Sequence, residues 1–428
     1  MKLVIFEDTL FDNFYPLTYM RPVFDLRCGR TTLREKIERA TGTAASALFV
    51  RDWMASVTAA KNDTAVNDLS ALRGGDDILL VNGRCLWLGD AKPTTGRDAV
   101  GKAGEEIAYV SLTKETAAKI DASDFDSFLA AACEAAAPKE VSGLKVLAFP
   151  WNLIEENVGA ITDDFEKLGK SGVEGTLAEG AYIWGPKDLV YIAPGAVIEP
   201  TAVIDTQDGP VIIEENVTVN PHTRIQGPAS IGRDTVLFGG KIREGTTIGP
   251  VCRVGGEVEE AIIHGHSNKY HDGFLGHAYV CEWVNLGALT TNSDLKNDYG
   301  TVEVMFKWQL TDTGSSKVGS FIGDHTKTSI GTLINTGTMI GMMSNILGIG
   351  SLLPKFVPSF AMFMQGMFFK ASPKKLIETA RTAMSRRKVE MLPEEEELLG
   401  FLFELTRDER MAAVKKSRKE MMARKGLA

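Results

Sequence analysis

The chain has 428 residues, of which 44% are hydrophobic and 24% are charged, an ordinary globular composition that excludes a disordered or collagenous protein. At roughly 100–200 residues per domain, this length predicts two or three domains. The net charge of −9 argues against nucleic acid as the main partner. Five scattered cysteines without CxxC spacing predict a reduced, cytoplasmic protein, and no apolar run is long enough to predict a membrane span.

Residues 1–175 have the alternating texture of an α/β domain. Short apolar runs predict buried strands, whereas helical spacing and alanine-rich composition predict helices. The strands are expected at 2–6, 77–81 and 146–149, and the helices at 32–41 and 114–137. Because strands that alternate with helices usually pair in parallel, we predict a mostly parallel sheet.

Residues 176–352 follow a six-residue period instead. Branched apolar residues are followed by a small residue and a turn former, as in the run 192–203. This period is typical of a left-handed parallel β-helix, in which the branched residue points into the prism. A β-sandwich would space its strands about 8–12 residues apart. Such prisms commonly assemble as homotrimers, which we expect here by fold analogy.

Two segments of this region, 256–274 and 291–317, lose the period. A solenoid accommodates insertions as loops that leave one face, and such loops often build the binding site. We therefore expect both segments to leave the β-helix as loops.

Residues 353–428 form the third predicted domain, a helical extension. Pro354 and Pro358 are expected to end the repeat, and helices are expected at 373–389 and 394–424. The extension holds 16 Lys/Arg against 10 Asp/Glu, whereas the rest of the chain holds 31 against 46. A solvated helical face is the favoured interpretation of this basic segment, with RNA or a membrane surface as alternatives.

All six histidines lie in the predicted β-helix, and four of them fall within residues 264–277. One interpretation is a metal site, for which His266, His271 and His277 would have to converge on one ion. The favoured interpretation is a general base, because histidine accepts a proton at neutral pH. We assign this role to His271, and we expect the other histidines to be surface or turn residues.

The favoured interpretation is supported by a resemblance. The motif His271-Asp272-Gly273-Phe274-Leu275-Gly276 is followed, fourteen residues after its histidine, by Asn285-Leu286-Gly287-Ala288. Both motifs and their interval resemble the acetyltransferase domain of the bifunctional N-acetylglucosamine-1-phosphate uridyltransferase/glucosamine-1-phosphate acetyltransferases. The resemblance implies that His271 deprotonates the sugar amine and that Asn285 lies in the site for the sugar phosphate and the acyl donor.

The same resemblance implies further substrate-binding residues. Arg243 would bind the sugar or its phosphate, with Lys269 as a second cation, Glu259 lies near a family glutamate, and Ser329 would lie near the acetyl group. Acetyl-CoA would be the co-substrate, in a groove between adjacent β-helices. One departure is Phe274, which replaces the tyrosine of the family's histidine motif.

The N-terminal segment resembles the nucleotidyltransferase half of that family more distantly. The glycine-rich phosphate loop is missing, so its backbone amides cannot cradle a triphosphate. Arg21, Arg27 and Arg30 would bind the nucleotide instead. The family's Mg²⁺-binding aspartate is also missing, which leaves Asp8 or Asp25 as candidate ligands.

The predicted protein is therefore an enzyme of amino-sugar nucleotide biosynthesis. Its β-helix would acetylate glucosamine 1-phosphate or a related sugar phosphate, and its N-terminal domain would use UTP to form UDP-N-acetylglucosamine. One alternative is a nucleotidyltransferase whose β-helix is only an oligomerisation or regulatory platform. A second alternative is a trimeric zinc hydratase, which requires the metal interpretation of the histidines.

Overall fold

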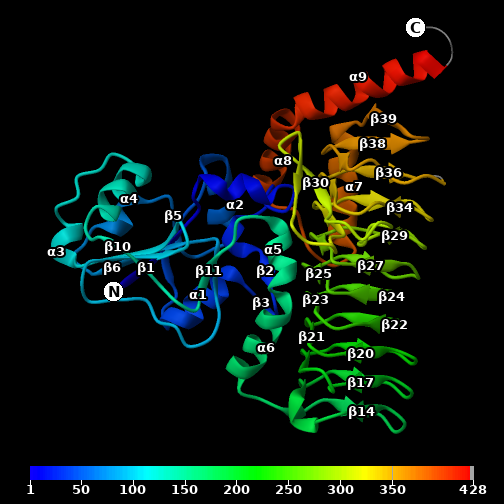
Figure 1. Cartoon of the computed structure of the whole chain (residues 1–428), viewed down its shortest axis with the longest axis horizontal. Helices are drawn as coiled ribbons and strands as arrows, with labels where there is room; N and C mark the ends of the chain where they lie inside the picture. The colour runs from blue at the N-terminus through cyan, green and yellow to red at the C-terminus, as the bar shows by residue number, and fades with distance from the viewer. Residues whose placement is uncertain (349, 425–428) are drawn as a thin grey trace. The chain divides into compact units, whose positions relative to one another are not determined.

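The computed structural model describes residues 1–348 and 350–424, which form two compact units (Figure 1). The N-terminal unit holds most of the first 149 residues, and the C-terminal unit holds the remainder. Two short early segments, Tyr15–Tyr19 and Cys28–Arg30, pack with the C-terminal unit. The described part of the chain contains no helix that is both long and apolar enough to cross a bilayer.

A seven-stranded sheet organises the N-terminal unit, in the order β10-β8-β9-β6-β1-β4-β5. Its central strand β1 (Lys2–Phe6) runs parallel to β4 (Ala45–Phe49) and β6 (Ile78–Asn82). The long strand β9 (Glu106–Leu112) is antiparallel to both of its neighbours. The remaining strands are β5 (Ala65–Val66), β8 (Ala99–Ala103) and β10 (Pro138–Glu140). The predicted α/β domain with a mostly parallel sheet is confirmed.

Local signals also explain the helices of this unit. In α1 (Leu33–Thr41), the Thr32 hydroxyl accepts from the Glu35 N–H, and the Glu35 carboxylate accepts from the Thr32 N–H. This capping box satisfies two amides that the first helical turn leaves without partners. The alanine-rich stretch forms α3 (Lys114–Ala117) and α4 (Phe125–Cys133). The strand expected at 146–149 lies earlier, as β11 (Leu144–Val146), antiparallel to β7 (Cys85–Trp87).

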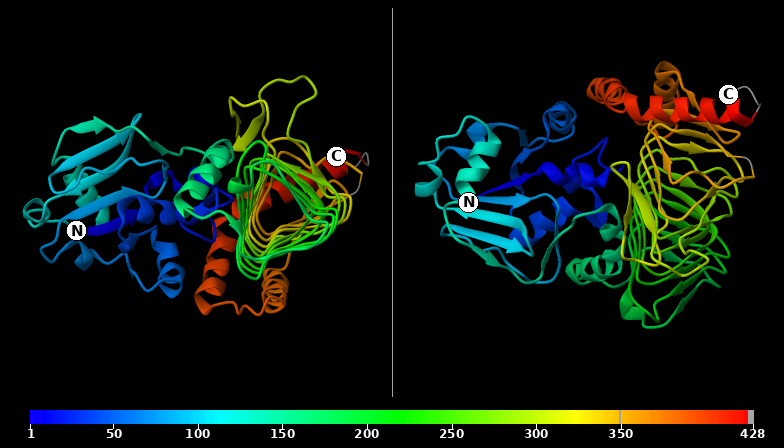
Figure 2. Two further views of the ribbon diagram at one scale, coloured as in Figure 1. Left: turned by 90° about the horizontal axis from the view of Figure 1, so that it is seen from below. Right: turned by 45° about the horizontal axis from the view of Figure 1, so that its top comes forward.

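The C-terminal unit is a stack of coils that are triangular when viewed along the stack (Figure 2). One face is a sheet of ten parallel strands, one from each coil. In order they are β12 (Gly172–Val173), β15 (Val190–Ile192), β18 (Val211–Ile213), β21 (Ala229–Ile231), β23 (Thr246–Ile248), β25 (Ile262–Ile263), β28 (Tyr279–Val280), β32 (Ser320–Ile322), β35 (Thr338–Ile340) and β37 (Phe356–Val357). In these strands one buried aliphatic position is in register from coil to coil, occupied by Ile192, Ile213, Ile231, Ile248, Ile263, Val280, Ile322, Ile340 and Val357. The predicted β-helix is confirmed.

The two segments that lose the period behave differently. Residues 256–274 stay in the coils: β24 (Arg253–Glu259) pairs with β26 (Asn268–Lys269) and β27 (Phe274–Gly276), so the expected loop is wrong. The register between β22 (Val236–Ile242) and β24 shifts instead at a glycine-containing bulge. The second segment does leave the coils, and it carries the antiparallel hairpin of β30 (Glu303–Phe306) and β31 (Gln309–Asp312).

The repeat continues past the prolines that were expected to end it. Strands β37 (Phe356–Val357) and β38 (Ala361–Met364) pair with the preceding coil, and β39 (Met367–Lys370) folds back on β38. Three helices follow, namely α7 (Pro373–Ser385), α8 (Pro393–Leu405) and α9 (Arg407–Arg424). The expected helical segment at the end of the chain is confirmed, although it begins at Pro373 rather than at 353 and its second helix is divided into α8 and α9.

Candidate active site

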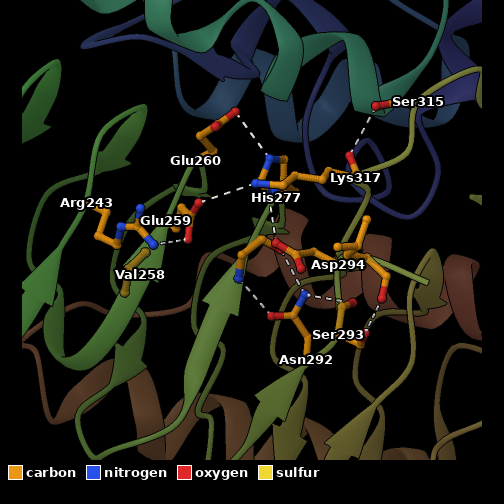
Figure 3. A network of polar contacts seen from close by, with 12 residues as sticks. Arg243, Val258, Glu259, Glu260, His277, Asn292, Ser293, Asp294, Ser315 and Lys317 are labelled. Atoms are coloured by element: carbon orange, nitrogen blue, oxygen red, sulfur yellow. Dashed lines mark hydrogen bonds and ion pairs between the residues drawn. The ribbon is translucent and has the colours of Figure 1, made fainter. Parts of the chain in front are cut away.

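A polar network on the β-helix gathers side chains from β22, β24, β27 and the segment that leaves the coils (Figure 3). Arg243 follows β22 directly, and its Nη1 lies 2.7 Å from Oε2 of Glu259 at the end of β24. The other Glu259 oxygen, Oε1, lies 3.6 Å from Nζ of Lys317. The structure thus brings together two residues of the predicted site, Arg243 and Glu259, and adds a lysine that the sequence did not indicate.

His277 stands beside this pair and is held by two carboxylates. Its Nδ1 lies 2.8 Å from Asp294 Oδ2, and its Nε2 lies 3.3 Å from Glu260 Oε2. Burial disfavours the charged imidazolium, but the hydrogen bonds to Asp294 and Glu260 outweigh it and raise the pKa of His277 to about 9. At neutral pH this raised pKa favours the imidazolium form of His277, which holds the two carboxylates as ion pairs.

A cavity of about 270 Å³ opens next to His277, within the C-terminal unit. Its polar lining comes from Glu260, His277 and Lys317 together with two serines, Ser315 and Ser316. The remaining lining residues are Val318 and, from α5 (Pro150–Glu155), Trp151, Ile154 and Glu155. The volume is close to the lower end of the range for ligand pockets, about 300 Å³.

His271, the predicted general base, lies in the exposed turn after β26. Its ring contacts the ring of Tyr270, with centroids 4.8 Å apart. Lys269 Nζ donates to the carbonyl oxygens of His271, at 2.8 Å, and of Gly255, at 2.9 Å. Burial lowers the pKa of Lys269 to about 8. The lysine therefore fixes the backbone of the turn, and the imidazole remains accessible.

Asn285 and Ser329 lie on neighbouring coils, because the Thr328 N–H donates to the Asn285 carbonyl at 3.0 Å. The exposed side chain of Asn285 accepts a hydrogen bond from Asn268 through Oδ1, at 3.2 Å. Ser329 Oγ donates to the Gly348 carbonyl at 3.3 Å. The side chains of His271 and Asn285 do not hydrogen-bond to each other in the described part of the chain.

The other five histidines occupy mostly turn positions, as expected. His222, His266, His277 and His325 have positive φ values and stand at corners of the coils. His264 is the exception, because it is buried and its Nδ1 lies 2.8 Å from the Tyr279 hydroxyl. Among the described residues, no group of three or more His, Cys, Asp or Glu side chains is arranged to hold a metal ion.

Sequence reasoning overlooked the partners of His277. Glu260 and Asp294 lie 17 residues before and after it, which is about the length of one coil. Charged residues repeated at the coil length stack on one face, so this spacing was the signal that could have indicated the network.

The three arginines expected to bind a nucleotide are divided between the two units. Arg21 and Arg27 belong to the N-terminal unit, and Arg30 packs with the C-terminal unit. Arg30 Nε lies 2.7 Å from Glu214 Oε1, and its backbone N–H donates to Asp164 at 2.7 Å.

Asp8, one of the two carboxylates considered for Mg²⁺, is already engaged by an arginine. It is paired with the fully buried Arg84, whose Nη2 lies 2.5 Å from Asp8 Oδ2 and 2.8 Å from Glu106 Oε2. Both oxygens of Asp8 accept hydrogen bonds from this guanidinium, whereas Mg²⁺ is best held by carboxylate oxygens that are free to coordinate it. Burial raises the pKa of Asp25, the other candidate, to about 6.

Parts of the chain are similar to known proteins. Residues 3–172 match the family model of the sugar nucleotidyl transferases. A bifunctional sugar-1-phosphate nucleotidylyltransferase/acetyltransferase of Sulfurisphaera tokodaii is 31% identical over 174 residues, which cover 38% of this chain and 41% of that protein. The bifunctional protein GlmU of Synechococcus elongatus is 25% identical over 207 residues, 40% of this chain and 41% of that protein. The matches thus span about two fifths of the length of these curated relatives.

Solved structures of UDP-N-acetylglucosamine acyltransferases were also found. The Arabidopsis protein is 13% identical, with a TM-score of 0.25, and the match covers 58% of this chain and 96% of that one. The Francisella novicida protein is 16% identical, with a TM-score of 0.21, and covers 57% and 84%. Residues 3–172 are therefore similar to the sugar nucleotidyl transferases, and part of the chain is similar to bifunctional nucleotidylyltransferase/acetyltransferases.

Proposed function

We propose that the chain is a transferase of amino-sugar nucleotide biosynthesis. The C-terminal unit would transfer acetyl from acetyl-CoA to the amine of glucosamine 1-phosphate or a related sugar phosphate. The N-terminal unit would form UDP-N-acetylglucosamine with UTP. The observation that carries the proposal is the exposed His271, in an acetyltransferase-like motif on a parallel β-helix that follows a sugar nucleotidyl transferase domain.

In the acetyl transfer, His271 accepts the proton that the sugar amine loses as it attacks the thioester carbonyl. Lys269 holds the carbonyl of His271 and so keeps the turn in place. A backbone N–H of a neighbouring coil stabilises the oxyanion of the tetrahedral intermediate. Collapse of that intermediate breaks the C–S bond, and the CoA thiolate takes the proton held by His271 and leaves as the thiol.

Arg243 and Lys317 are the cations proposed to bind the acceptor's anionic group. Both are only partly shielded, with 38% and 45% of their side chains exposed, so they can bind a ligand while paired with Glu259. Asn285 and Ser329 would contact the acyl donor and the acetyl group. A homotrimer in the cytoplasm is proposed on fold analogy, with acetyl-CoA between adjacent β-helices.

The decisive experiment is thiol release from acetyl-CoA across a panel of amino-sugar phosphates. His271→Ala is expected to lower kcat by about 10²–10⁴-fold, the usual contribution of a general base. His222→Ala is the matched control, because His222 is an exposed corner histidine outside the motif. Near-normal turnover of His271→Ala, with an unchanged oligomeric state, would refute the assignment.

A second candidate is a nucleotidyltransferase whose β-helix serves only as a platform. It is favoured by the match of the family model to residues 3–172 alone. Nucleotide binding would then involve Arg21 and Arg27 of the N-terminal unit. Pyrophosphate formation from UTP and N-acetylglucosamine 1-phosphate, without thiol release from any acceptor, would identify this function.

A further inference from the structure

A residue of the helical extension reaches back to the β-helix. Arg387 follows α7 closely, and its Nη2 donates to Oδ1 of Asn268 at 3.0 Å, across 119 residues of sequence. Asn268 begins β26 and is paired in register with Asn285 on the next coil. The extension therefore contacts the neighbour of a residue assigned to substrate binding.

This contact sets the direction of a short chain of hydrogen bonds. A guanidinium only donates, so the Asn268 atom facing Arg387 must be its carbonyl oxygen. The amide nitrogen of Asn268 then donates to Asn285 Oδ1, at 3.2 Å. With its oxygen occupied, Asn285 presents its own NH₂ group as a donor. The hydrogen-bonded asparagine pair therefore ends at the NH₂ group of Asn285, a donor for which no acceptor is found among the described residues.

Two further cations flank the asparagine pair. Strand register places Arg253 one coil before Asn268, and Lys327 one coil after Asn285. Arg253 donates to the carbonyl oxygens of Asp234 and Cys252, and Lys327 donates to the carbonyl oxygen of His325. In the described ranges 1–348 and 350–424, no carboxylate forms an ion pair with Arg253, Lys327 or Arg387.

Burial also disfavours the charged forms of these cations. It lowers the pKa of Lys327 to about 8, and together with the nearby Arg253 and Arg386 it lowers the pKa of Arg387. Arg387 Nε is buried and has no hydrogen-bond partner within the described structure. Partly buried cations and orphaned donors are costly unless an anion pairs with them.

We propose that Arg253, Lys327, Arg387 and the NH₂ group of Asn285 form a binding site for the phosphoryl groups of a ligand. Neighbouring coils are about 4.8 Å apart, so Arg253 and Lys327 are separated by about 14 Å along the stack. A row of donors spread along the stack suits a ligand with two or more phosphoryl groups better than a single carboxylate. The inference rests on the proposed function for the role of Asn285, and it adds the chemical class of the group that is bound.

The test is calorimetric titration of the full chain with inorganic pyrophosphate at about 0.15 M ionic strength, where non-specific attraction is screened. Arg387→Gln is expected to weaken binding by about tenfold or more, since charge-assisted hydrogen bonds contribute about 1.5–3 kcal/mol and 1.4 kcal/mol corresponds to tenfold. Arg386→Gln is the matched control. It removes the same charge one residue earlier, at an exposed position, and should change the affinity less than twofold.

A second variant guards against misfolding of the first. Asn268→Asp places a carboxylate against Arg387, so it should keep the contact but neutralise the cation and weaken pyrophosphate binding. Absence of saturable binding to the unmodified chain, or equal weakening by Arg386→Gln and Arg387→Gln, would overturn the site. Competition by CoA, UDP or glucosamine 1-phosphate then identifies the source of the phosphoryl group.

The outcome is separable from that of the proposed function. If the chain releases thiol but Arg387→Gln leaves its affinity for pyrophosphate unchanged, only the phosphoryl site is overturned. Conversely, binding that depends on Arg387, in a chain that releases no thiol with any acceptor, keeps the site and overturns the acetyl transfer.

Discussion

The charge state of His277 follows from the position of two carboxylates on adjacent parts of the stack. Asp294 and Glu260 contact opposite ring nitrogens, so both N–H groups of the imidazolium are satisfied at once. Neutral imidazole has only one N–H and would leave one carboxylate facing a lone pair. The network therefore stabilises the protonated ring and ties the excursion after β29 (Thr291–Asn292) to the coils.

This arrangement predicts a loss of stability at alkaline pH. The folded pKa of His277, about 9, lies above the ordinary histidine value of about 6.5, so the histidine's contribution is fully present below about pH 6.5 and is lost as the pH rises through about 9. A pKa shift of this size contributes on the order of 3 kcal/mol to the free energy of unfolding. Urea unfolding from pH 6 to 9.5 should show the free energies of the unmodified chain and of His277→Gln converging across this window. A constant difference between them would contradict the ion network.

Arg84 shows what a missing motif cannot reveal. The sequence indicates that Asn82-Gly83 lacks the metal-binding aspartate, but it does not show which group neutralises the negative charge of Asp8. In the structure a guanidinium from the next residue, Arg84, takes that role, and its Nη1 also donates to the Leu147 carbonyl at 2.6 Å. The pairing joins residues 76 positions apart, beyond the reach of local patterns.

At the scale of the elements, the hexapeptide pattern predicts the coils because each inward aliphatic residue is locally recognisable. The corners of the coils recur at equally regular positions. Three residues after the inward position, the backbone has positive φ at Asn216, Asp234, Val251, His266, Trp283, His325, Met343 and Phe360. Sequence reasoning failed at 256–274 because a glycine bulge shifts the register without ending the coil, so a lost period was mistaken for a loop.

Val251 is the least suitable of these corner residues, since a β-branched side chain at φ 61° crowds its own backbone. Left-handed backbone costs an ordinary residue about 1–2 kcal/mol, whereas asparagine tolerates it. Val251→Asn should therefore raise the free energy of unfolding by about 1 kcal/mol. Val236→Asn, an ordinary strand position in β22, is the control and should not stabilise the chain. An equal response of the two variants in urea unfolding would argue against strain at the corner.

The candidate site was only partly predictable for a related reason. Motif spacing indicated His271 and Asn285 as candidates, and these two residues lie close together in sequence. Arg387 and Lys317 contact residues of the candidate sites only because segments that are distant in sequence fold back onto the β-helix. Their positions depend on how α7 and the excursion between β29 and β32 (Ser320–Ile322) fold back, which no periodic signal records.

In the whole molecule, the boundary between the two units is not a single point in the sequence. Cys28–Arg30 packs with the C-terminal unit, although it lies within the first thirty residues. The Gly29 N–H donates to Asn157 Oδ1 at 2.6 Å, and the Arg30 N–H donates to Asp164 Oδ2 at 2.7 Å. Asn157 and Asp164 are buried in α6 (Asn157–Leu168), so both acceptors depend on a segment that is distant in sequence.

A fragment of residues 150–428 should therefore be less stable than the same unit in the whole chain. Removing donors from buried acceptors costs about 1–3 kcal/mol each, so the unfolding temperature of the β-helix should fall on the order of 10 °C. Arg30→Gln in the whole chain is the control: it keeps both backbone donors and removes the partly exposed ion pair with Glu214, so its shift should be small. Scanning calorimetry at one fixed scan rate compares the three proteins. A fragment that unfolds at the temperature of the whole chain would show that the early segment contributes nothing to the β-helix.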